Sequence, residues 1–259
     1  MGEVVAAVGA LRSRRRGSDV RVDQQPGFVL HSYAWRETSL IVEAFTRDYG
    51  RIALVARGAK RPTSQFRGLL TPFSPLALAW SGRSETKSMI RVEWLGGLAP
   101  LRGDGLLAAF YLNELMVRLL PRGDAHAALF ATYVQTLREL EREGASREVV
   151  LRAFELDLLR EMGYAPALDH AADGAPIAAE RWYRIDAQQG LVVAEDRLDE
   201  LCVRGASIIA LARRDLSQPQ TAAESKVLLR QLIRYHLNGQ PLNTRRILQD
   251  LRRMELELP

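Results

Sequence analysis

The sequence predicts an α+β fold, in which a small antiparallel barrel of five strands precedes a mostly α-helical region with one small inserted hairpin. Between Pro26 and Leu95, short apolar runs of period two are separated by turn residues. After Gly96 and Gly97 the apolar residues recur with a helical period instead. No helical stretch between the strands is long enough for a crossover, so we expect a barrel, with an SH3-like barrel as the structural alternative.

Five runs form the predicted barrel, and two turns and a long loop connect them. Asp48-Tyr49-Gly50 is typical of a hairpin turn, and 81–84 is the second turn. Residues 57–75 are rich in Gly, Pro, Ser and Thr, which predicts a long loop. The predicted strands are 28–33, 40–45, 51–56, 76–80 and 89–94.

Apolar stripes of helical period predict the helices of the second region. Within it, 182–185 and 191–193 are separated by Gln188-Gln189-Gly190, which predicts the inserted hairpin. The stripes cover 106–119, 129–140, 149–162 and 227–237, with a short final helix at about 244–253. The expected division is a flexible basic extension (1–24), a barrel domain (25–98) and a helical domain (99–259), in which 164–195 is the inserted hairpin region.

Positive charge is concentrated in the first part of the chain. The 259 residues carry a net charge of +5, but the first 100 residues hold 15 Lys and Arg against 8 Asp and Glu. The remaining residues hold 21 against 23. This asymmetry indicates two modules, of which the first faces a polyanion such as a nucleic acid. A merely solubilising basic surface is the alternative.

Composition excludes several classes of protein. The single cysteine, Cys202, excludes an internal disulfide framework and a multi-cysteine zinc site. No apolar run approaches the roughly 20 residues of a membrane-spanning helix, and the N-terminus lacks the apolar stretch of a secretory signal. We therefore expect a cytoplasmic protein without a membrane partner.

Catalytic motifs are missing from the sequence. There is no G-x-S-x-G elbow, no H-E-x-x-H and no P-loop, and the four histidines stand singly in different predicted elements. We therefore expect neither catalysis nor a cofactor. A metal-dependent nuclease remains the alternative, because carboxylates that are scattered in sequence can cluster in space.

A basic stretch from Arg47 to Arg67 is the strongest local signal, because it contains a single acidic residue, Asp48. Cations on a loop beside a barrel can follow a phosphate backbone, which predicts DNA binding; a protein-interaction scaffold with a solubilising loop is the alternative. Phe66 could stack on bases, but an anchor folded under the loop is the favoured interpretation. The predicted DNA-binding residues are Arg47, Arg51, Arg57, Lys60, Arg61 and Arg67, with Lys87 and Arg91 extending the patch.

Seven segments occur in an order that points to a known family. They are FVLHS (28–32), RETSL (36–40), GR with LVARGAK (50–60), PFSPL (72–76), YLNEL (111–115), RAFEL with LL and GY (152–164), and LNGQPL (237–242). Together they resemble the RecO family of bacterial recombination mediators.

The resemblance implies an N-terminal OB-fold barrel and a helical domain. It further implies a protein that binds single- and double-stranded DNA, anneals complementary strands, and works with RecR and RecF to load RecA onto DNA coated by single-strand-binding protein. The helical domain would hold that protein's acidic C-terminal tail, with Arg152 pairing its carboxylates beside Leu151 and Tyr111. The alternative is that Arg152 pairs only with Glu148 or Glu155 on its own helix.

One departure from the family concerns zinc. Many members place two cysteine pairs around the inserted hairpin, whereas 168–171 and 190–193 contain no cysteine here. We therefore predict no metal, with the hairpin held by packing of Trp182 and Tyr183.

Overall fold

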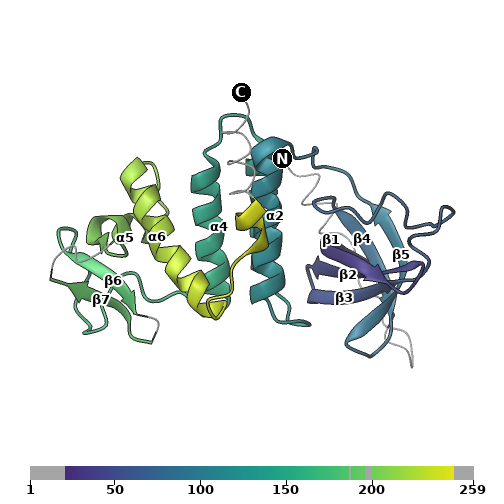
Figure 1. Ribbon diagram of the computed structural model, residues 1–259, viewed down its shortest axis with the longest axis horizontal. Coiled ribbons are helices and arrows are strands. Elements are labelled where there is room, and N and C mark those ends of the chain that lie inside the picture. The colour runs from purple at the N-terminus through teal and green to yellow at the C-terminus, as the bar shows by residue number, and fades with distance from the viewer. Residues whose placement is uncertain (1–20, 187, 196–199, 248–259) are drawn as a thin grey trace. The chain divides into compact units, whose positions relative to one another are not determined.

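The computed structural model describes residues 21–186, 188–195 and 200–247, and these described residues fall into two compact units that divide between residues 142 and 143 (Figure 1). Residues 1–20 of the predicted extension lie outside the described residues. Residues 21–24, which the prediction also placed in the extension, belong to the first strand. Arg21 and Val22 pair there with Ser81 and Trp80, so the barrel begins earlier than the apolar run suggests.

Five strands close into a barrel in the first unit, in the order β1-β2-β3-β5-β4 (Figure 1). The predicted OB-like barrel is confirmed. One pairing differs from the antiparallel expectation, because β3 and β5 run parallel where the barrel closes. The strands are β1 (Arg21–Trp35), β2 (Ser39–Thr46), β3 (Gly50–Ala56), β4 (Leu76–Ser81) and β5 (Thr86–Trp94).

Apolar side chains from every strand fill the barrel. Trp80 is the largest of them and is fully buried, with the ring of Tyr49 edge-on against it at 5.2 Å between centroids. Phe66, from the loop after β3, is 5% exposed and belongs to the same cluster. Its burial agrees with the interpretation of Phe66 as an anchor.

Two helices, α2 (Gly103–Leu119) and α3 (Ala127–Glu141), form one compact unit with the barrel. The rings of Phe28 and Phe45 pack against Phe130 and Tyr133, at 5.2–6.2 Å between centroids. Asn113 then donates to the carbonyl of Leu30 at 2.9 Å and accepts from the Tyr133 hydroxyl at 2.6 Å. Burial raises the pKa of Tyr133, so its hydroxyl stays a donor.

Glycine is required where the loop between α2 and α3 meets β3. Gly50 has φ of 62°, and a Cβ built on it would lie 1.6 Å from the carbonyl oxygen of Asp124. The amide of Gly123 donates to the carbonyl of Arg51 at 2.8 Å. A side chain at position 50 would therefore force the loop off the barrel.

A buried carboxylate fixes the same contact. Glu43 is 3% exposed and accepts from Arg51 at 3.2 Å and from Arg122, which also reaches Glu85 at 2.6 Å. Burial lowers the pKa of Arg51 against the attraction of Glu43, whereas the hydrogen bond to Glu43 raises the pKa of Arg122. The carboxylate thus holds a strand and a loop together.

In the second unit, helices flank a small three-stranded sheet. The predicted hairpin is β6 (Trp182–Asp186) with β7 (Gly190–Ala194), and β8 (Val203–Arg204) pairs on the other side of β6. The helices are α4 (Arg147–Glu161), α5 (Gly205–Ala212) and α6 (Pro219–His236).

Packing of Trp182 and Tyr183 positions this hairpin. Tyr183 is 1% exposed, and its hydroxyl accepts from the amide of Ala178 at 2.9 Å. The guanidinium of Arg204 lies 4.3 Å from the centre of the Trp182 ring, and the Arg204 amide donates to Glu224 of α6 at 2.7 Å. These contacts connect β6, β8 and α6.

Replacing Glu43 by Gln should destabilise the barrel by about 2 kcal/mol or more, because Arg51 would be left buried without its counter-charge. The free energy of unfolding from a urea titration measures the effect. Glu93→Gln is the matched control, since its pair with Arg91 is half exposed and is worth under about 1 kcal/mol. Equal stability of the two variants would contradict the role given to Glu43.

Candidate nucleic-acid interface

Four cations lie together on the loop that follows β3. Arg57, Lys60, Arg61 and Arg67 are all exposed. In the part of the chain that the structure describes, no ion pair joins any of the four to a carboxylate. Their charge therefore faces solvent, where it can attract phosphates.

The loop holds these cations in fixed places. It is a succession of turns, in which the amides of Arg61, Ser64 and Arg67 each donate to a carbonyl three residues back, at 3.0–3.1 Å. Ala59 and Phe66 are buried in the barrel core between the cations. The side chain of Gln65 also donates to the carbonyl of Ile90 on β5, at 3.2 Å.

The other four predicted DNA-binding residues have partners of their own. Arg47 binds Asp48 at 2.8 Å, a hydrogen bond that raises the pKa of Arg47. Arg91 pairs with Glu93 at 3.3 Å, and the Lys87 ammonium lies 3.5 Å from the carbonyl of Ser84. Each of these residues thus has a partner, whereas the four loop cations form no ion pair with a carboxylate among the described residues.

Arg51 departs furthest from the expected surface position. Its side chain is 15% exposed and its guanidinium is paired with Glu43. Because withdrawing it would leave the buried Glu43 without one of its partners, we assign Arg51 to the ion cluster between the barrel and the loop after α2.

Sequence reasoning missed the exposed aromatic residues at the end of β1. Tyr33 is 41% exposed and Trp35 is 43% exposed. Strict alternation from the buried Val29 would turn both side chains into the barrel. A register shift between Val29 and His31 reverses the alternation and turns them outward. The sequence signal is only the aromatic alternation itself, which is equally typical of a core strand.

The outward side chains of the sheet form rows across the strands. Tyr33 pairs in register with Ile41 of β2, which pairs with Val55 of β3, which pairs with Ser88 of β5. Trp35 pairs with Ser39, whose hydroxyl accepts from the amide of Gly58 at 3.4 Å. In OB-folds, the face of strands 2 and 3 and the loops between strands 1 and 2 and between strands 4 and 5 bind oligonucleotides.

The residues predicted to hold a partner's tail divide between the two units. Tyr111 lies on α2 in the first, whereas Leu151 and Arg152 lie on α4 in the second. The Arg152 side chain is 7% exposed and pairs with Glu155, as the alternative interpretation expected. Its Nε atom is buried and has no hydrogen-bond partner among the described residues.

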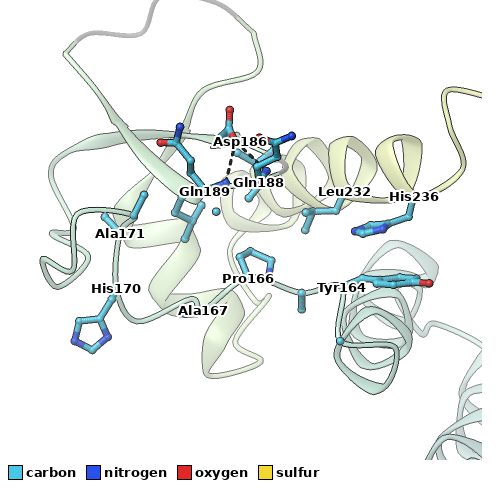
Figure 2. A pocket seen from close by; sticks show the side chains of 16 residues that line it. Tyr164, Pro166, Ala167, His170, Ala171, Asp186, Gln188, Gln189, Leu232 and His236 are labelled. Carbon is cyan, nitrogen blue, oxygen red and sulfur yellow. Dashed lines mark hydrogen bonds between the residues drawn. The ribbon is translucent and has the colours of Figure 1, made fainter.

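A cavity of about 310 Å³ lies in the second unit between residues 163–172, the hairpin and α6 (Figure 2). Tyr164 and His236 stack at its edge, 3.9 Å between ring centres, and burial lowers the pKa of His236. Asp186 already accepts from the amides of Gln188 and Gln189 at 2.9 Å. The only acid among the described lining residues therefore already binds amides of its own turn.

None of the described helices combines the length and apolar character needed to cross a membrane. Over the same residues, no three His, Cys, Asp or Glu side chains are grouped closely enough to hold a metal ion.

Known protein families match both parts of the chain. Residues 21–98 match the family described as Recombination protein O N terminal, and residues 101–246 match Recombination protein O C terminal. The chain is 50% identical to the DNA repair protein RecO of Ralstonia nicotianae, over 90% of this chain and 86% of the relative.

Two further relatives have the same name. The DNA repair protein RecO of Burkholderia orbicola is 47% identical over 95% of this chain and 88% of its own. That of Dechloromonas aromatica is 46% identical over 90% of this chain and 98% of its own. The chain belongs to the RecO family of DNA repair proteins.

Proposed function

We propose that this protein binds and anneals single-stranded DNA and, with RecR and RecF, helps to load RecA onto DNA coated by single-strand-binding protein. The observation that carries the DNA-binding part is the group of four exposed loop cations, Arg57, Lys60, Arg61 and Arg67, without carboxylate partners among the described residues. The partners are proposed from the family to which the chain belongs.

The proposed mechanism is neutralisation of charge without covalent chemistry. Two DNA strands repel each other through their phosphates, and cations that bind both strands reduce that repulsion. A loop anchored in the barrel core offers its cations in a fixed arrangement, so that little side-chain and loop freedom is lost on binding.

Charge reversal of the loop is the direct test. The triple variant Arg57→Glu, Lys60→Glu, Arg61→Glu should bind and anneal single strands at least about tenfold less well, because three phosphate contacts become repulsive. Fluorescence anisotropy with a labelled strand measures binding, and strand annealing is followed in parallel.

The matched control is Arg181→Glu, Arg184→Glu, Arg213→Glu, which reverses three exposed cations of the second unit. It should retain most of the affinity. Unchanged annealing by the loop variant would favour the scaffold alternative, and Mg²⁺-dependent loss of the strand would favour the nuclease alternative.

The salt dependence of binding should reflect the number of exposed loop cations. Four neutralised phosphates predict a slope of about −3 for log affinity against log salt on single strands. Affinity should then fall about 50-fold between 50 and 200 mM salt, and the slope should drop to about −1 in the triple loop variant. A slope near zero for the parent protein would contradict electrostatic binding.

For the tail site, we propose that Arg152 and Leu151 contact the acidic C-terminal peptide of single-strand-binding protein. The buried Nε of Arg152 without a partner supports this, whereas the pair with Glu155 competes with it. Arg152→Gln should weaken peptide binding about tenfold, on the scale of a lost charge-assisted hydrogen bond. Leu151→Ala should weaken it by about the same factor, on the scale of lost apolar contact, and both variants should leave binding of bare DNA unchanged.

Leu151→Ala leaves the buried ion pair intact, and thus separates loss of the site from loss of the fold. Arg214→Gln, which breaks an exposed pair with Asp157 in the same unit, is the control and should bind the peptide normally. If both test variants keep full peptide affinity while folded, the assignment is wrong.

A further inference from the structure

We propose that the outward face of β1, formed by Tyr33 and Trp35, stacks on unpaired nucleobases and gives the barrel a preference for single-stranded over duplex DNA. The inference rests on the proposed function, because it adds a base-contacting surface to the DNA site of the loop cations. The ligand of this surface is a single DNA strand with accessible base faces.

The position of the two rings is the first support. Both are turned outward by the register shift after Val29, and both are more than two-fifths exposed. They are two residues apart on one strand and therefore roughly 7 Å apart along it. The ring of His31 stacks beside Tyr33 at 6.2 Å between centres, which extends the aromatic surface along β1.

The cations next to the rings are the second support. The turn after β1 is tied to the cationic loop, because the amide of Lys60 donates to the carbonyl of Thr38 at 2.9 Å. Arg57 directly follows Ala56, the last residue of β3 that pairs with β2. A strand whose bases reach the rings can thus place phosphates beside the loop.

Within the turn, Arg36 lies next to the rings but adds no net charge. It is exposed, and its guanidinium lies 5.9 Å from the centre of the Trp35 ring. The neighbouring carboxylate of Glu37 offsets its charge, so that the net positive charge near the rings comes from the loop. Rings beside a cationic loop are the combination found in proteins that bind single strands without sequence preference.

A third aromatic residue of the barrel, Trp94, is exposed but has no net positive charge beside it. Trp94 on β5 is 64% exposed, more than either ring of β1. Its strand neighbours Arg91 and Glu93 form an ion pair with each other, at 3.3 Å, which leaves no net charge there. Trp94 therefore serves as the matched control.

The experiment compares Tyr33→Ala, Trp35→Ala and Trp94→Ala on three DNAs of equal length: oligothymidylate, a strand of abasic sites, and a duplex. Each β1 variant should bind oligothymidylate between about fivefold and a hundredfold less tightly than the parent, the cost of one lost base stack. Binding to the abasic strand and to the duplex should change by less than about twofold, because neither presents an accessible base face.

The control and a conservative variant complete the design. Trp94→Ala should bind all three DNAs like the parent. Trp35→Phe should keep most of the oligothymidylate affinity, because a ring face is retained. Thermal unfolding midpoints are compared for every variant.

The outcomes separate this inference from the proposed function. Equal losses on all three DNAs, or no loss on oligothymidylate, would overturn stacking by β1 while the triple charge reversal still weakens binding. If the charge reversal leaves binding intact, the proposed function itself fails.

Discussion

Burial of Phe66 in the barrel core is the contact on which the proposed DNA-binding surface depends. The loop after β3 contains four exposed cations, and a polar surface loop of this kind would be mobile without an apolar anchor. With Phe66 and Ala59 packed among the barrel side chains, the turns between them have fixed places. Burying one large ring thereby orders several charged side chains that do not stabilise the fold themselves.

The excess of positive charge in the first hundred residues has two different uses. Arg51 is largely buried in the first unit and pairs with the carboxylate of Glu43, to which Arg122 also binds. A buried guanidinium is tolerable only with such a partner, because desolvation of an unpaired charge is costly. The loop cations stay in water, where the same charge costs little and remains available to phosphates. Net charge alone does not distinguish these two uses.

Much of the barrel could be predicted from the sequence, because its strands alternate with period two and its turns contain glycine at the required positions. The long loop and the anchoring role of Phe66 followed from composition in the same way. The ion pairs of Glu43 were harder to predict, because Glu43 lies eight residues from Arg51 and far from Arg122 in sequence. Only the folded register shows that both arginines meet the same carboxylate.

The outward turn of Tyr33 and Trp35 could not be predicted for a different reason. One extra residue in β1 shifts the register after Val29, and a single-residue shift exchanges the inner and outer faces of everything that follows. No residue type marks the shift, since neither glycine nor proline stands there. The result is an aromatic strand end on the surface, next to the turn between β1 and β2, which corresponds to one of the loops by which OB-folds bind oligonucleotides.

Hydrogen–deuterium exchange of the full chain with and without oligothymidylate tests directly whether the loop and the end of β1 contact DNA. Binding should slow exchange of amides in residues 31–39 and 57–68, the end of β1 with its turn and the cationic loop. Slowed exchange confined to other segments, with these two unchanged at saturating DNA, would contradict this prediction.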